Sequence, residues 1–186
     1  MSEDPGSQPA SSAEPSFDAA HVEHALELFR SEQNIAMGVA AGAVAALLGA
    51  AAWAVITVII KYQIGWMAVG VGFLVGIAVR TFGKGIDKIF GIIGAVLALL
   101  GCGLGNLLAV CGMIAVEQDM AFGEVLSQLN LERVNELMVA TFSPMDLLFY
   151  GIAVYEGYKL SFRQLTQQEI AARITGAPSG NYGAQP

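Results

Sequence analysis

Three long stretches without Asp, Glu, Lys, Arg or His constrain the fold more than any other feature of this chain. They are residues 33–60, 62–79 and 89–116, which contain 28, 18 and 28 residues respectively. A helix that crosses the hydrocarbon core of a bilayer needs about 20 consecutive apolar residues. The sequence therefore predicts an all-α integral membrane protein.

The overall composition excludes several classes of protein. Only 13% of the 186 residues are Asp, Glu, Lys or Arg, and 55% are hydrophobic, whereas soluble domains carry about 25% charged residues. The net charge of −7 opposes binding to the phosphate backbone of nucleic acids. A soluble enzyme, a secreted disulfide scaffold and a nucleic-acid-binding domain are thus excluded, and the lipid bilayer is the partner that we expect.

The apolar stretches divide the first two thirds of the chain into flanking segments and spans. Residues 1–15 are rich in Ser, Pro, Ala and acidic residues, so we expect a disordered acidic tail. Residues 16–33 place apolar side chains at helical spacing, which predicts an amphipathic cytoplasmic helix with Ser16 as its N-cap. This helix should continue almost directly into the first span. We place the first three spans at about residues 35–60, 64–79 and 89–116.

The last third of the chain predicts surface helices and a fourth span. Residues 117–142 are apolar on one side only, which is typical of one or two amphipathic helices on the external membrane surface. Ser143, Pro144 and Asp146 form a helix-start signal. The helix at about residues 144–162 either crosses the membrane or lies in the interface. We favour crossing, which makes residues 34–163 a four-helix membrane bundle and residues 164–186 a cytoplasmic tail.

The distribution of cations predicts the orientation of this bundle. With four spans, seven of the nine Lys and Arg residues lie on the side of both termini, and only Lys61 and Arg133 lie on the other side. The side richer in Lys and Arg faces the cytoplasm. We therefore predict that both termini are cytoplasmic. A bacterial inner membrane is the expected location.

Small residues recur on one face of each of the first three spans. In the third span they are spaced 3.6 residues apart on average, so they form one continuous face that includes Ala98 and Ala109. Membrane helices use such faces for close backbone approach, either within one chain or between chains. The glycines that we expect at helix contacts are Gly38, Gly42, Gly72, Gly76, Gly94, Gly101, Gly105 and Gly112.

Two polar side chains are expected at membrane depth. Asn106 needs a hydrogen-bonding partner on a neighbouring helix, or else it lines a substrate or ion path. Glu156 is expected to form a structural ion pair with Lys159 at the cytoplasmic interface, where Arg80 also lies. The interfaces themselves are marked by aromatic and basic residues, which are Tyr62, Trp66, Arg80, Lys84, Lys88 and Lys159.

The sequence contains no recognisable catalytic or metal-binding motif. Walker A, GxSxG, HExxH and CxxC patterns do not occur. His21 and His24 are three residues apart but lack further ligands nearby, so we predict a solvated helix face and no metal. Cys102 and Cys111 face opposite sides of one helix, which excludes a disulfide within it. We therefore predict a non-enzymatic protein without a cofactor.

One stretch carries a family resemblance. Residues 62–76 read YQIGWMAVGVGFLVG, and Gly101-Cys102 and Leu104-Gly105-Asn106 follow in the next span. This pattern resembles one found in small uncharacterised bacterial inner-membrane proteins. The resemblance covers the second and third spans and implies no activity.

Two functions remain open on the sequence. The first is a scaffold or accessory subunit that packs by its helices, either as a homo-oligomer or within a larger membrane complex. The second is a small oligomeric channel or transporter subunit that uses Asn106 and Glu156 along a path between protomers. An intramembrane enzyme is disfavoured, because no pair of facing catalytic groups can be named. Whether Asn106 faces water or a packed helix distinguishes the first two.

Overall fold

The computed structural model describes residues 18–141 and 143–176, and every regular element in these ranges is a helix. Three of the helices are long and apolar enough to cross a membrane: α2 (Ile35–Ile60), α3 (Trp66–Gly83) and α4 (Lys88–Glu117). The other helices are α1 (Ala19–Ser31), α5 (Phe122–Ser127), α6 (Leu131–Thr141), α7 (Pro144–Leu160) and α8 (Gln167–Thr175). The predicted all-helical fold is confirmed, and so is the presence of three helices that are long and apolar enough to cross a membrane.

Some expectations fall on residues that the structure does not describe. The acidic tail at residues 1–15, the N-cap Ser16 and residues 177–186 of the C-terminal tail lie outside the described residues.

The chain divides into two compact units. One is Phe29–Gln164, which contains α2 to α7, and the other contains α8 and the part of α1 up to Leu28. The sequence predicts only a cytoplasmic tail after residue 163, whereas the structure has the helix α8 there. Its signal was a capping box, because the side chain of Thr166 accepts from the backbone of Glu169 and the Glu169 carboxylate accepts from the backbone of Thr166.

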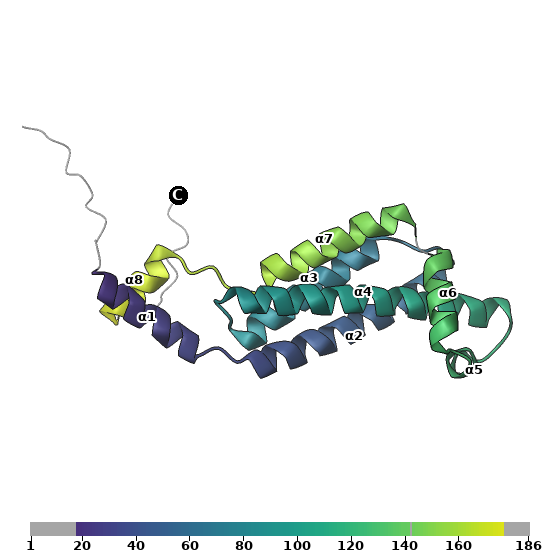
Figure 1. Ribbon diagram of the computed structural model, residues 1–186, viewed down its shortest axis with the longest axis horizontal. Coiled ribbons are helices and arrows are strands. Elements are labelled where there is room, and N and C mark those ends of the chain that lie inside the picture. Colours follow the sequence, from purple (N-terminus) through teal and green to yellow (C-terminus); the bar gives the residue numbers. More distant parts are fainter. Residues whose placement is uncertain (1–17, 142, 177–186) are drawn as a thin grey trace, which may run out of the picture. The chain divides into compact units, whose positions relative to one another are not determined.

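Four helices of the Phe29–Gln164 unit pack along one another. α3 and α4 contact each other, and both of them contact α2 and α7 (Figure 1). Because the connections reverse the chain, α2 and α4 run parallel, and α3 and α7 run opposite to them. We call the end with the α3–α4 loop the basic end and the opposite end the α5–α6 end. α6 lies across the latter (Figure 1).

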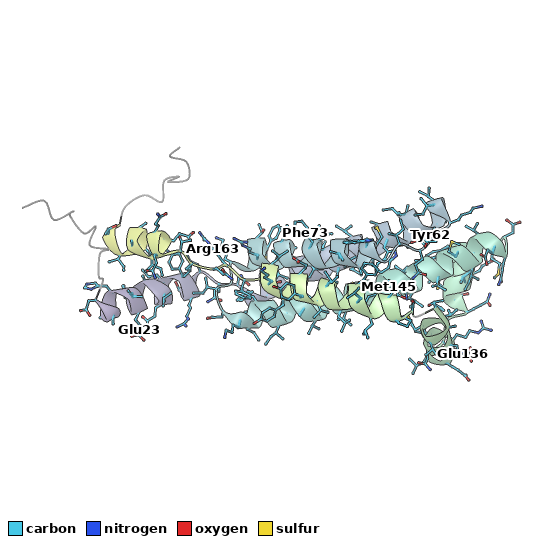
Figure 2. The ribbon with its side chains drawn as sticks, turned by 90° about the horizontal axis from the view of Figure 1, so that it is seen from above. Glu23, Tyr62, Phe73, Glu136, Met145 and Arg163 are labelled. Carbon is cyan, nitrogen blue, oxygen red and sulfur yellow. The ribbon has the colours of Figure 1, made fainter. Side chains whose placement is uncertain are left out.

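Many of the buried residues of this unit are small, although Trp53 and Phe90 are also buried, and large apolar side chains cover its outside. The buried residues include Ala50, Ala68, Ala98, Ala109 and Ala153, each 0% exposed. The exposed residues include Leu47, Leu48, Phe73, Leu74, Leu99 and Leu100, and Figure 2 shows Phe73 on the outer side of α3. A soluble bundle has the opposite distribution, with its large apolar side chains inside.

The second span differs from its predicted bounds of 64–79. α3 begins at Trp66 and continues to Gly83, so Arg80 lies in the last turn of a helix and not in a loop. Lys84 ends the helix in a left-handed conformation (φ 49°) and donates its N–H to the carbonyl of Arg80. The predicted end was placed at the first charge. A charge limits burial in lipid, but it does not interrupt the hydrogen bonds of a helix.

The first amphipathic helix and the first span are separate helices joined by a short segment. α1 and α2 are separated at Glu32–Asn34. Asn34 caps α2, because its side-chain oxygen accepts from the N–H of Met37 at 2.9 Å, and its own N–H donates to the carbonyl of Gly83 at 2.9 Å. A cap at the start of α2 and a tertiary hydrogen bond thus hold the segment between α1 and α2, which contains no Gly or Pro.

The last helix of the unit is shorter than the fourth span predicted at 144–162. α7 has 17 residues, which is about 25 Å, and it does not qualify as a span by its own length and composition. α6 and α7 qualify only when taken together, and they are bent by 102° relative to each other.

Candidate functional site

The small-residue face of α4 contacts different helices along its length. A Cβ added at Gly94 would lie 2.7 Å from Cβ of Ser161, at the end of α7. A Cβ at Gly101 would lie 2.9 Å from Cγ1 of Val71 on α3. Only glycine permits such close approach. The face therefore meets α7 near the basic end and α2 and α3 farther along.

The other expected glycines also lie against helices of the same chain. Gly72 on α3 is the closest approach to backbone, since an added Cβ would lie 2.7 Å from Cα of Ala153 on α7. Gly112 differs, because Val58 Cγ2 at 2.6 Å is its one neighbour within 4 Å. Matching contacts exist for Gly38 with Phe90, Gly42 with Val79, Gly76 with Leu160 and Gly105 with Trp53.

Asn106 lies in the interior of the unit, 1% exposed, and connects three elements. Its side-chain oxygen accepts a hydrogen bond from Nε2 of Gln63, which is in the α2–α3 turn. Its Nδ2 lies 3.9 Å from the sulfur of Met138 on α6. The polar group in α4 is therefore satisfied by side chains at the α5–α6 end of the unit.

Further polar groups surround Asn106, and we call the set Gln63, Cys102, Asn106 and Tyr150 the polar core cluster. The Tyr150 hydroxyl on α7 donates to the carbonyl of Cys102 at 3.2 Å. The Cys102 thiol donates to the carbonyl of Ala68 at 3.6 Å. Sequence reasoning missed Tyr150 and Gln63, although a tyrosine inside an apolar helix is a signal that its hydroxyl needs a partner.

Two more buried polar atoms lie on α2. Nε1 of Trp53 and Oγ1 of Thr57 have no hydrogen-bonding partner within the described part of the chain. The two residues are one helical turn apart, and both are at most 2% exposed. The polar core cluster can hold the helices in register through its hydrogen bonds.

The predicted ion pair of Glu156 with Lys159 is not formed. Within residues 18–141 and 143–176, Glu156 makes no ion pair with Lys159 or with Arg80. The Lys159 ammonium lies 5.4 Å from the ring centroid of Tyr155 instead. Lys159 and Tyr155 are four residues apart and share one face of α7, where a cation–π contact forms readily.

Hydrogen bonds connect the segments of the basic end. The carboxylate of Asp87, in the α3–α4 loop, accepts from Nε2 of Gln33 at 2.9 Å and lies 3.4 Å from Nε of Arg30. The N–H of Arg163 donates to the carbonyl of Gly85 at 2.8 Å. The loop thus holds the start of α2 and the end of α7, and the expected basic residues Arg80, Lys84 and Lys88 flank it.

Exposed aromatic residues mark the α5–α6 end. Tyr62 is 71% exposed and Trp66 is 67% exposed, and the Trp66 ring lies 5.4 Å from that of Phe149 on α7. Tyr62 and Arg163 lie toward opposite ends of the unit (Figure 2). Exposed Tyr and Trp at the end of a bundle, and an excess of Lys and Arg at one of its two ends, are typical of membrane-spanning proteins.

Neither a metal site nor a relative accompanies these features. The residues that the structure describes include no group of three or more His, Cys, Asp or Glu side chains that could hold a metal ion. A scan of family models and searches of curated proteins and of solved structures found no match to the chain. The resemblance of residues 62–76 to small inner-membrane proteins therefore stays a prediction.

Replacing Asn106 by Leu should lower the free energy of unfolding by about 1–2 kcal/mol, because Gln63 loses its buried acceptor. Denaturant titration of the purified protein in detergent measures this. Gln63→Leu should cost a similar amount, and the double variant should cost no more than about either single one. Fully additive effects in this cycle would show that the two side chains do not interact.

Proposed function

We propose that this chain is a non-enzymatic membrane protein of four spans that acts as a scaffold or accessory subunit, as a homo-oligomer or within a larger membrane complex. The observation that carries the proposal is the distribution of side chains in the Phe29–Gln164 unit. Many of its buried residues are alanine and glycine, while Leu48, Phe73 and Leu100 are more than half exposed. A bilayer, or the helices of another membrane protein, is the surrounding that suits such a surface.

The alternative is a small oligomeric channel or transporter subunit. It requires Asn106 or Glu156 to face a hydrated path. The burial of Asn106 and its hydrogen bond from Gln63 support the scaffold over this alternative. The α3–α4 loop at the basic end also supports the scaffold, because its hydrogen bonds favour a single stable arrangement of the helices.

The proposed orientation places the basic end in the cytoplasm of a bacterial cell. Arg30, Arg80, Lys84, Lys88 and Arg163 lie at or next to this end of the chain's four packed helices. The α5–α6 end has Lys61 and Arg133. The positive-inside rule then makes both termini cytoplasmic, with α7 as the fourth span.

Cysteine labelling tests this orientation. In a background with Cys102→Ala and Cys111→Ala, Lys84→Cys and Gln167→Cys should react only with reagent from the cytoplasmic side. Ser127→Cys, on α5, should react only from outside. Labelling of Gln167→Cys from outside would remove the fourth span, whereas labelling of Lys84→Cys from outside would reverse the bundle.

The function itself is tested by what the protein binds and by what it does not conduct. Purification in mild detergent with mass spectrometry of the eluate should show a homo-oligomer or a stable complex with another membrane protein. Vesicles with the purified protein should show no ion or proton flux above that of empty vesicles, and Glu156→Gln should fold and assemble as the wild type does. A flux that is present in the wild type and lost in a well-folded Glu156→Gln protein would favour the channel.

A further inference from the structure

An apolar groove of about 680 Å³ lies between α2 and α4 in the half of the unit nearest the α5–α6 end. Both helices line it with apolar residues, and four of these are small: Ala51 and Ala54 from α2 and Gly112 and Ala115 from α4. The volume is in the range of about 300–1,000 Å³ that is usual for small-molecule sites. The groove is therefore large enough for a ligand of apolar character.

The groove exists because the small-residue face of α4 extends beyond the side chains that cover it. Gly101 and Gly105 lie against Val71 and Trp53, whereas an added Cβ at Gly112 would meet Val58 alone. Beyond Gly105, small residues on both parallel helices leave space between them, and no larger side chain of the described chain fills it.

The charge at the outer end of the groove is negative. Asp119, just beyond the end of α4, is the one ionisable residue of its lining. α2 and α4 both end here, so the negative ends of two helix dipoles lie on the same side. Lys61 is not among the lining residues, but it follows α2 directly at the same end of the unit and carries the charge that suits a phosphate. An ammonium group near Asp119 and a phosphate near Lys61 together describe a zwitterionic headgroup.

We infer that this groove binds one acyl chain of an amine-headed phospholipid such as phosphatidylethanolamine, with the ammonium group near the Asp119 carboxylate. The inference rests on the proposed membrane location. A lipid suits the groove better than a helix of a second copy does. Met120 and Phe122, in and after the turn that follows α4, line the groove's outer end. A helix continuing through the bilayer would have to pass this turn, whereas an acyl chain ends at its headgroup.

The test counts lipids that stay on the purified protein. Wild type and variants are reconstituted with an equal mixture of phosphatidylethanolamine and phosphatidylglycerol, extracted in mild detergent and measured by native mass spectrometry. Ala51→Phe, which adds a ring from an exposed position in the groove wall, should lower the retained lipid about tenfold. Ala52→Phe is the matched control, since Ala52 is equally exposed on α2 but does not line the groove, and it should retain lipid as the wild type does.

Asp119→Asn tests the headgroup. The variant should keep its lipid but lose about twofold to fivefold of its preference for phosphatidylethanolamine, as expected for a solvent-exposed charge pair. Equal retention by Ala51→Phe and wild type would overturn the site. A wild-type dimer that Ala51→Phe dissociates would assign the groove to a second copy instead.

Flotation of the wild type with vesicles separates this inference from the proposed function. Protein that does not float would overturn the membrane location and the lipid site together. Protein that floats, with retention unaffected by Ala51→Phe, would overturn the lipid site alone.

Discussion

Gly72→Leu should disrupt the packing of α3 against α7 and lower the free energy of unfolding by about 3 kcal/mol or more. The reason is that an added Cβ at Gly72 would lie 2.7 Å from Cα and 2.9 Å from the carbonyl carbon of Ala153. Backbone atoms cannot turn away as a side chain can, so the two helices must separate. Denaturant titration and size-exclusion chromatography in detergent measure the loss of stability and of compact shape.

Gly70→Leu is the matched control for this prediction. Gly70 lies two residues earlier on the same helix, and an added Cβ there meets nothing within 4 Å. The substitution should change the free energy of unfolding by less than about 0.5 kcal/mol, as expected for a surface position. Equal stability of the Gly70 and Gly72 variants would show that α3 and α7 do not pack as described.

Leu48→Asp should prevent insertion of α2 or greatly lower the yield of folded protein in the membrane fraction. Leu48 lies near the middle of α2 and is 63% exposed, so in the proposed bundle it faces lipid. An aspartate at the centre of a span costs about 3 kcal/mol or more relative to leucine. Expression in membranes and resistance to alkaline extraction measure the effect.

The same substitution at Leu131 is the control. Leu131 is the first residue of α6 and is 87% exposed, so Leu131→Asp places a charge at the water-facing end of the unit and should leave yield unchanged. In a soluble bundle both substitutions would be harmless, because both side chains would already face water. Normal yield of Leu48→Asp in a soluble form would therefore contradict the membrane proposal.

The glycines show which helix contacts the local sequence pattern can predict and which it cannot. Their spacing in α4 predicted one continuous face, and Gly94, Gly101 and Gly105 do lie against other helices. Spacing could not say whose helix covers that face, because a groove of small residues accepts any helix of suitable shape. The contacts with α2, α3 and α7 come from the same chain, and only beyond Gly105 does the face open into a groove.

For the polar residues, the sequence predicts that a partner is needed but does not identify that partner. That Asn106 needs a partner followed from its place in an apolar stretch, but its partner Gln63 is 43 residues away. The expected pairing of Glu156 and Lys159 considered only charge and separation along α7. In the structure the Lys159 ammonium instead lies over the ring of Tyr155, which is one turn earlier on α7. Several neighbours compete for each polar group, and proximity in sequence does not decide among them.

The sequence by itself determined that the chain is helical, that three of its helices are apolar along a membrane-spanning length, and which face of α4 is small. These are properties of local composition and of a 3.6-residue period, so they depend on neighbours within one helix. The tertiary structure decided that α7 packs along α3 and α4, that Asn34, between α1 and α2, bonds to Gly83, and that a groove stays open between α2 and α4. Each of these depends on contacts between segments far apart in the chain, whose free energies are set by the shapes of both surfaces at once.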